Sequence, residues 1–424
     1  MEPVISFFGL LSMLLIAWVL SENRRKMNIR LIVSGVLLQF SLALLFLWTP
    51  YGTRFFLLCD FLVGGILQCS DAGAQFVFGK SFRDHEFAFS VLPTVIFFSS
   101  LTAVLFYFGV LQAIVKAMAR MMVWIMDTSG AESLCTAANV FVGMTVAPLA
   151  VRPYLDTMTR SEIMAMMTGG MATVAGGVMA SYVSMGAEAG HLMLASIMSA
   201  PAALVIAKIM VPETEASLTK GHVRIDVPPN GENLLDAACR GASEGLKLAL
   251  NIGAMLIAFI GLIHLIDWGM AWIIVFDEPL TLQRILGWGL APVAWSMGVE
   301  WKDAQRVGAL LGTKTVFNEF IAYQALVTEV KPQISHRSYV ICLYALCGFA
   351  NFGSVAVMIG GLGKIIPARR GDLARYGLRS MIGGTLAAFM TACIVGMLLG
   401  TAHRGPLPAE PPPSPAIEIE ARPS

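Results

Sequence analysis

A lysine, an asparagine and a glutamate lie in an otherwise apolar stretch, LLGTKTVFNEFIAYQAL, at residues 310–326. A helix facing water would carry more charge than this, and a helix facing lipid would carry none. An ionised side chain inside a membrane costs about 2.5 to 3.5 kcal/mol on insertion scales and usually marks a substrate or ion path. We therefore interpret Glu319 as a residue on a substrate or ion path. The alternative is a salt bridge to Lys314, although a spacing of five does not place the two on one helical face.

The overall composition indicates an integral membrane protein. The 424 residues are 56% hydrophobic and 13% charged, whereas a soluble domain has about 25% charged residues. The net charge of +1 argues against a nucleic-acid partner. The apolar run at residues 5–20 lacks the preceding basic segment of a signal peptide, so we interpret it as a first membrane span.

Hydropathy predicts an all-α integral membrane fold, because a bilayer core about 30 Å thick needs about 20 apolar residues per helix. Eight spans are predicted, at residues 4–20, 31–49, 89–110, 161–184, 190–211, 246–268, 335–361 and 378–400. Residues 55–78 and 280–297 are interrupted by polar and small residues, which favours interfacial helices. Residues 113–156 and 302–327 are broken by Gly, Pro and charge, and are interpreted as re-entrant hairpins.

The fourth and seventh predicted spans have similar centres, GMATVAGGV at 170–178 and GFANFGSV at 348–355. Each of these spans follows one of the two hairpins. Paired interruptions in the two halves of a membrane protein indicate an inverted-repeat transporter with a binding site near the midplane. The alternative is that the small residues only allow close helix packing. Backbone carbonyls freed at such breaks, together with hydroxyl or amide side chains, suit a small hard cation.

Basic residues in short loops predict that both termini lie outside the cell. With the N-terminus outside, three basic clusters fall on the cytoplasmic side: Arg24, Arg25, Lys26 and Arg30; Arg152 and Arg160; and Lys364, Arg369, Arg370, Arg375 and Arg379. The Pro-rich tail at 403–424 is expected to be disordered.

Three stretches resemble the concentrative nucleoside transporters: GTKTVFNEFIAY at 312–323, ALCGFANFGSVAVMIGGLG at 345–363, and VGMTVAPLAVRPYL at 142–155 followed by GGMATVAGGV at 169–178. The resemblance covers essentially the whole chain, in order. It implies a homotrimeric symporter in the lipid bilayer that works by an elevator mechanism. A scaffold would comprise 1–110 and 212–300, and a moving transport part 111–211 and 301–402. The span count, without an extended N-terminal part, favours a bacterial inner (plasma) membrane.

The same resemblance implies two sets of ligands. It places Glu319, Asn351 and Ser354 on the ribose hydroxyls of a nucleoside, with Phe349 beside them. A carboxylate accepts two hydrogen bonds and suits a vicinal diol. The implied Na+ site consists of the Asn139 side chain, the Val142 carbonyl, the Thr173 hydroxyl and the Val174 carbonyl. Some members of the family couple to protons, and Glu319 is the group that would then carry the proton.

The tip of the first hairpin departs from the family pattern. It reads Gly143-Met144-Thr145-Val146, where the family usually has Gly-Gln-Thr-Glu and uses the Gln and Glu to contact the nucleobase. Met and Val cannot form those hydrogen bonds, and an apolar site discriminates weakly among ligands. We therefore predict a nucleoside importer with altered base preference, in which the base packs against Met144, Thr145, Val146 and Val178.

Three questions stay open at the level of sequence. The carried solute is alternatively another ribosyl or polar metabolite, or ordinary nucleosides are carried only weakly. Lys314 has no ligand role, and is expected to pair with another group of its hairpin or to extend toward the surface. An enzyme is not favoured, because the apolar spans supply neither a His pair nor an Asp pair to work with Glu319.

Overall fold

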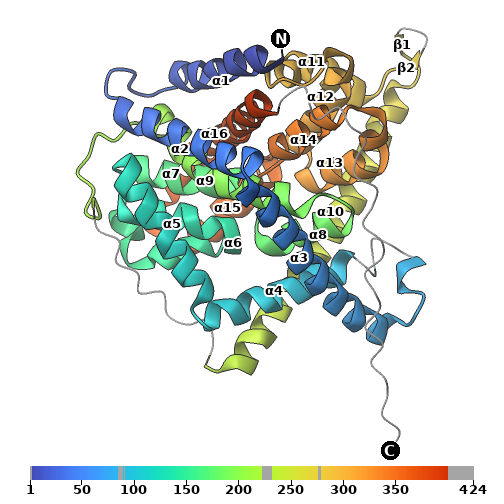
Figure 1. Ribbon diagram of the computed structural model, residues 1–424, viewed down its shortest axis with the longest axis horizontal. Helices are drawn as coiled ribbons and strands as arrows, with labels where there is room; N and C mark the ends of the chain where they lie inside the picture. The colour runs from blue at the N-terminus through green and yellow to red at the C-terminus, as the bar shows by residue number, and fades with distance from the viewer. Residues whose placement is uncertain (1, 85–88, 90, 222–231, 276–277, 400–424) are drawn as a thin grey trace, which may run out of the picture.

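The computed structural model describes residues 2–84, 89, 91–221, 232–275 and 278–399. Within these ranges the regular elements are helices apart from a short antiparallel pair of strands, β1 (Ile274–Val275) and β2 (Glu278–Pro279). The predicted all-α class is therefore confirmed (Figure 1). The predicted disordered tail at 403–424 lies outside the described residues.

The α-helices are α1 (Glu2–Val19), α2 (Ile29–Trp48), α3 (Pro50–Phe78), α4 (Leu92–Tyr107), α5 (Val110–Met126), α6 (Gly130–Val142), α7 (Arg160–Ala172), α8 (Gly176–Ser184), α9 (Ala189–Met210), α10 (Leu234–Met270), α11 (Leu282–Ser296), α12 (Trp301–Val316), α13 (Glu319–Ala325), α14 (His336–Ala345), α15 (Phe352–Ile365) and α16 (Arg370–Leu398). The 3-10 helices are η1 (Phe82–Asp84), η3 (Ala147–Thr157), η5 (Lys331–Gln333) and η6 (Pro367–Arg369), and η4 (Leu326–Val330) is a π-helix.

Most predicted spans are found as long apolar helices. Among the described residues, seven stretches are long and apolar enough to cross a membrane: α1, α2, α3, α7 with α8, α9, α10, and α16 with the turn before it. An eighth is added if α4 and α5 form one span, although the two helices meet at a bend of 76°. The predicted seventh span is divided into α14 and α15 by an irregular segment at 346–351.

The helix α3 differs from the sequence interpretation of an interfacial helix at 55–78. It is one continuous helix of 29 residues, and its length and composition qualify it as a membrane span. The small residues that suggested an interruption do not break it. Its interfacial position stays a prediction.

The first re-entrant hairpin begins later than the predicted 113–156. Residues 110–126 form the separate helix α5, which ends where Asp127 adopts a left-handed conformation with φ 54°. Ser129 then starts α6 through a capping box, in which its side chain accepts from the Glu132 N–H and Glu132 accepts from the Ser129 N–H. The hairpin itself therefore consists of α6 and η3. The second hairpin, predicted at 302–327, consists of α12 and α13 with its tip at Phe317 and Asn318.

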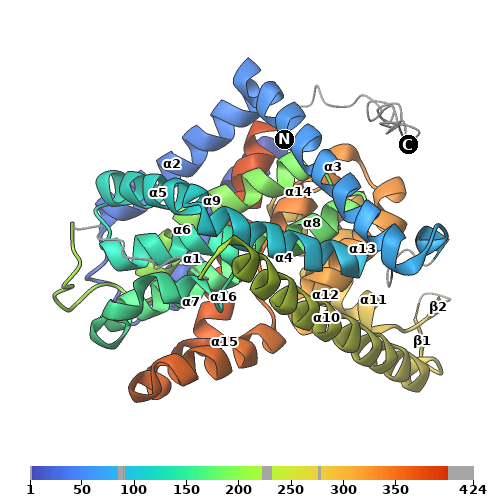
Figure 2. The ribbon, with the colours of Figure 1, turned by 90° about the horizontal axis from the view of Figure 1, so that it is seen from below.

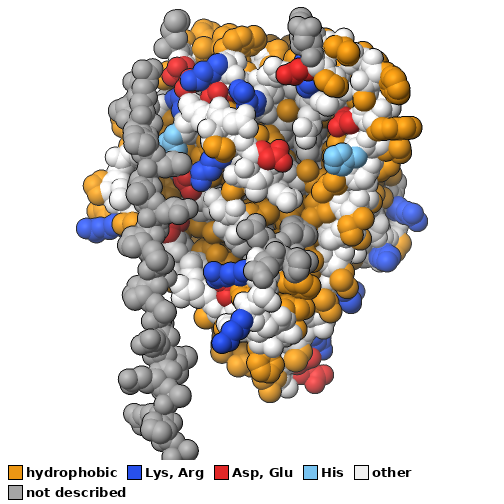
Figure 3. Space-filling model, turned by 90° about the vertical axis from the view of Figure 1, so that its right-hand side faces the viewer, with side chains coloured by type: hydrophobic (Ala, Val, Ile, Leu, Met, Phe, Trp, Pro, Cys, Tyr) orange, Lys and Arg blue, Asp and Glu red, His pale blue; other side chains and the backbone are white. Residues whose placement is uncertain are grey.

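The core lies around α7, α9 and α16, which occupy the middle of Figure 1. In the most apolar stretch of α9, 89% of the residues are buried. In the corresponding stretch of α10, only 11% are buried. Figure 2 shows α10 along one side of the molecule, next to α4. Its apolar side chains face outward, and Ile257 is 81% exposed. Figure 3 shows hydrophobic side chains gathered at the upper rim, the right-hand edge and the lower end of one face, with charged side chains between them.

A buried polar cluster, the Lys208 cluster, joins the starts of α6 and α7 to the segment after α9. The Lys208 Nζ lies 2.7 Å from Glu132 Oε2 and 3.2 Å from Glu213 Oε2, and donates to Ser161 Oγ at 3.0 Å. Glu162 accepts from the Thr159 N–H at 2.8 Å and from the Ser217 hydroxyl at 2.6 Å. The Gly130 N–H, at the start of the first hairpin, donates to the Thr219 carbonyl at 2.9 Å.

Candidate functional site

The breaks in the fourth and seventh spans lie against each other. The first break separates α7 from α8 at residues 173–175, and the second separates α14 from α15. Gly348, in the second break, has φ 97°. A Cβ atom at Gly348 would lie 2.5 Å from the Met171 carbonyl oxygen and 2.6 Å from the carbonyl carbon of Ala172. Only glycine tolerates both that backbone conformation and that close approach.

Glu319 and Asn351, predicted as solute ligands, are joined directly. Asn351 Nδ2 donates to Glu319 Oε2 at 2.9 Å, and both side chains are buried. Glu319 is the first residue of α13, after Asn318, whose Oδ1 caps that helix by accepting from the Ile321 N–H at 2.9 Å. Asn351 caps α15 in the same way, accepting from the Ser354 N–H at 2.8 Å. Helix capping therefore fixes the backbone around both polar groups.

Tyr182 is a site residue that the sequence interpretation missed. Its hydroxyl donates to Glu319 Oε1 at 3.3 Å, from α8 in the other half of the chain. The Tyr182 ring is fully buried and stacks on Tyr323, with ring centroids 4.2 Å apart and an interplanar angle of 24°. The Tyr323 hydroxyl donates to the Leu343 carbonyl at 2.8 Å. A tyrosine in an apolar span is a detectable signal, because a buried phenol requires a hydrogen-bond partner.

Lys314 does not pair with a group of its own hairpin or reach the surface, so that expectation is wrong. Its side chain is only 1% exposed, in the last turn of α12. The ammonium donates to the Ala345 carbonyl at 3.0 Å and to the Cys347 carbonyl at 2.8 Å. Lys314 therefore contacts the break in the seventh span.

The other predicted solute ligands lie near the breaks without hydrogen bonding to Glu319. Ser354 is buried in the first turn of α15, and Phe349 is half-buried in the break before it. Val178 is buried in α8, four residues before Tyr182 and so on the same helical face. Side-chain hydrogen bonds among the described residues link the Glu319 carboxylate to Asn351 and Tyr182, and of these two only Asn351 was a predicted ligand.

The tip of the first hairpin packs between α7 and α15. A Cβ atom at Gly170 would lie 2.7 Å from Met144 Cβ, so Met144 packs directly on α7. A Cβ atom at Gly361 in α15 would lie 3.7 Å from Thr145 Cγ2. Thr145 is exposed, while Met144 and Val146 are half-buried. The tip thus presents two apolar side chains and one hydroxyl.

The predicted cation ligands lie where the end of α6 meets the first break. Gly143 follows Val142 with φ 80°, and a Cβ atom there would lie 2.9 Å from Ala175 Cβ. Asn139 is fully buried, and its Oδ1 has no hydrogen-bond partner among the described residues. Thr173 Oγ1 donates to the Gly169 carbonyl at 2.9 Å, which leaves its lone pairs available.

These oxygen atoms are suitable ligands for a small hard cation. A buried amide oxygen without a partner is costly, and a bound cation would satisfy it. The side-chain donors are neutral oxygens, the ligand type that Na+ shares with other hard cations. Within the described part of the chain there is no group of three His, Cys, Asp or Glu side chains that would hold a transition metal.

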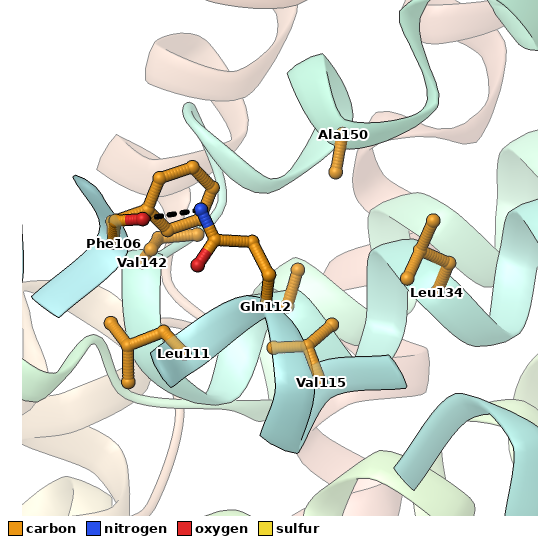
Figure 4. A pocket seen from close by; sticks show the side chains of 8 residues that line it. Phe106, Leu111, Gln112, Val115, Leu134, Val142 and Ala150 are labelled. Carbon is orange, nitrogen blue, oxygen red and sulfur yellow. Dashed lines mark hydrogen bonds between the residues drawn. The ribbon is translucent and has the colours of Figure 1, made fainter. Parts of the chain in front are cut away.

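A separate small pocket lies between the first hairpin and the helices α4 and α5 (Figure 4). Its lining is apolar except for Gln112, whose Nε2 donates to the Phe106 carbonyl. The pocket shares only Val142 with the predicted ligands. It is therefore not the solute site.

Three family models together match nearly the whole chain. They are the Na+ dependent nucleoside transporter N-terminus at residues 8–81, the nucleoside recognition gate at 88–189, and the Na+ dependent nucleoside transporter C-terminus at 191–396.

Individual relatives agree with these matches. The chain is 43% identical to solute carrier family 28 member 3 of Eptatretus stoutii, over 94% of this chain and 61% of the relative. It is 38% identical to sodium/nucleoside cotransporter 1 of Rattus norvegicus, over 94% of this chain and 64% of the relative. The chain thus spans less than two thirds of the length of these relatives. It is also 41% identical to an uncharacterized transporter of Haemophilus influenzae, over 94% of this chain and 99% of the relative.

The structure is also similar to a solved one. CNTnw in an inward-facing substrate-bound state matches with a TM-score of 0.88 and 40% identity, over 96% of this chain and 100% of that chain.

Proposed function

Because this chain belongs to the Na+-dependent nucleoside transporter family, we propose that it imports nucleosides by coupling their movement to a sodium gradient. The family is one of multi-pass membrane transporters and not of enzymes. The observation that carries the proposal is the buried hydrogen bond between Glu319 and Asn351. It places a carboxylate and an amide side by side at the junction of a hairpin and a broken span.

The solute would bind through its ribose. Asn351 and Tyr182 each donate to one oxygen of the Glu319 carboxylate, so each oxygen keeps a lone pair for a further donor. Two adjacent ribose hydroxyls can supply those donors in charge-assisted hydrogen bonds. Ser354 adds a hydroxyl from the first turn of α15, and Phe349 an apolar surface beside it.

Sodium would bind at Asn139 Oδ1, the Val142 carbonyl, Thr173 Oγ1 and the Val174 carbonyl. The partnerless Asn139 oxygen and the contact of Gly143 with Ala175 support this assignment. When bound, the cation would supply a positive charge between the end of α6 and the break after α7. Asn139 and Thr173 would then join these two segments and hold the tip of the first hairpin beside the solute. Proton coupling is the alternative, with Glu319 as the carrier.

The nucleobase would be recognised mainly by shape. Met144, Val146 and Val178 offer no hydrogen bonds to a base edge, and only the Thr145 hydroxyl is polar. We therefore expect weak discrimination among bases. Transport of a different ribosyl or polar metabolite is the second candidate, favoured by the same loss of polar groups at the tip.

We also propose a homotrimer in the plasma membrane of a bacterium, with both termini outside and an elevator movement. The scaffold would be built from 1–110 and 212–300, and the moving part from 111–211 and 301–402. The outward-facing apolar side of α10 supports a scaffold role for that helix.

Uptake of labelled uridine and adenosine into proteoliposomes tests the function, with and without an inward sodium gradient. We expect sodium-dependent uptake of both solutes. A second assay uses an inward proton gradient without sodium. Uptake under that condition would show that transport is coupled to protons. If folded protein takes up neither nucleoside under either gradient, the proposed substrate class is wrong.

A further inference from the structure

The second hairpin satisfies three carbonyls at the end of α14. Lys314, from the first arm of the hairpin, donates to the carbonyls of Ala345 and Cys347. Tyr323, from the second arm, donates to the carbonyl of Leu343. All of the side chains involved are buried. Both arms therefore contact the same interrupted helix end.

A helix that ends inside a membrane leaves its last four carbonyls without partners. Water is not available there to satisfy them, so other protein groups must do so. A lysine ammonium has three N–H donors and a positive charge, which is favourable at the negative end of a helix dipole. Lys314 thus replaces the backbone donors that α14 loses where the span breaks.

The position of Lys314 relative to Glu319 gives this contact a further consequence. The two residues flank the tip of the second hairpin, Phe317 and Asn318. Lys314 holds the Cys347 carbonyl at the start of the break, and Glu319 holds the Asn351 side chain at its end. The hairpin therefore fixes the irregular segment between α14 and α15 at both of its ends.

We propose that Lys314 is a positioning residue for solute binding, which holds the break in the seventh span so that Asn351 meets Glu319. Lys314 does not itself contact the solute. If the Lys314 ammonium is removed, the contact with the Cys347 carbonyl is lost. The hydrogen bond between Glu319 and Asn351 is then the only one of the two contacts that still holds the break. The ribose-binding groups would then be less well ordered before the solute arrives, and affinity would fall. The binding readout of this inference rests on the proposed function.

The test compares Lys314→Met with Lys302→Met. Methionine keeps an unbranched stem at Lys314 but removes every N–H donor. Lys302 lies on the same helix, and its side chain is 69% exposed, so its replacement controls for the loss of a lysine from α12. We expect Lys314→Met to weaken uridine binding by about tenfold or more, and Lys302→Met to leave it unchanged.

A double-mutant cycle with Asn351→Ala separates positioning from a general loss of stability. If Lys314 acts through Asn351, Lys314→Met changes uridine affinity far less in the Asn351→Ala background than in the wild type. Equal changes in both backgrounds would overturn the inference, as would wild-type affinity in folded Lys314→Met protein. If Lys314→Met does not yield folded protein, Lys314→Arg takes its place, because arginine keeps the charge but not the compact donor geometry.

A second readout does not depend on nucleoside binding. The same cycle is measured through the melting temperatures of the four proteins. Coupled residues give non-additive shifts, whereas independent residues give additive ones, which would contradict the inference. If the wild type binds no nucleoside, the proposed function fails, and the melting temperatures alone decide the role of Lys314.

Discussion

Replacing the Glu319 carboxylate with an amide removes one oxygen acceptor and introduces a donor in its place. In Glu319→Gln the new NH2 group must face a group that donates to the carboxylate. These groups are the Asn351 amide and the Tyr182 hydroxyl, together with the ribose hydroxyls of the proposed solute. The variant thus loses one charge-assisted hydrogen bond and weakens the others. Such bonds contribute about 1.5 to 3 kcal/mol each.

A loss of about 3 kcal/mol corresponds to an increase in Kd on the order of 100-fold. Isothermal titration with uridine in saturating sodium measures this change. Glu329→Gln is the matched control, because Glu329 is exposed in η4, directly after the same hairpin. Its uridine affinity should equal that of the wild type.

Deoxyuridine analogues show whether the binding free energy lost in Glu319→Gln comes from contacts with the ribose hydroxyls. Removing one ribose hydroxyl should reduce the binding free energy of the wild type by about 1.5 to 3 kcal/mol. In Glu319→Gln the reduction should be about 0.5 to 1.5 kcal/mol, because only a neutral hydrogen bond is lost. An equal penalty in both proteins would refute the placement of the ribose on Glu319. So would wild-type affinity for uridine in folded Glu319→Gln protein.

Three further predictions test neighbouring residues. Tyr182→Phe keeps the stacking on Tyr323 but removes the donor to Glu319, so uridine affinity should fall about two- to tenfold, and unchanged titration curves would exclude a contribution of that hydrogen bond. Asn139→Leu removes the partnerless amide oxygen, so the sodium concentration that gives half-maximal uptake should rise at least several-fold; the cation assignment fails if the sodium dependence stays as in the wild type. Gly348→Ala forces a Cβ atom to within 2.5 Å of a carbonyl oxygen at a residue with φ 97°, which should lower the melting temperature clearly, whereas Gly360→Ala, facing open space, should not.

The broken spans and the Glu319 carboxylate were predictable because their signals are local, whereas the assignment of Asn351 to the same site came from the family resemblance. Gly348 and the small residues around it mark the break, and a carboxylate in an apolar hairpin marks a site. Asn318 and Asn351 each occupy a helix N-cap, so the same side chains that end a loop also position polar groups. These features depend on short stretches of sequence.

Two of the missed features depend on contacts between distant segments. The partners of Lys314 are backbone carbonyls, which carry no signature in the sequence. Tyr182 meets Glu319 across the two halves of the chain, and a single aromatic residue in span four does not indicate its partner. A third missed feature is local: α5 is separated from the first hairpin by the left-handed conformation of Asp127, which non-glycine residues rarely adopt.

The Lys208 cluster has a consequence for how the protein is made. All the groups that it joins lie between Ser129 and Thr219. During synthesis, every one of them is present before any part of the second hairpin leaves the ribosome. The polar contacts between the first hairpin and the start of α7 can therefore form while the chain is still being synthesised. Tyr182, by contrast, contacts Glu319 and Tyr323, which are synthesised much later, so the proposed solute site is completed only by the last third of the chain.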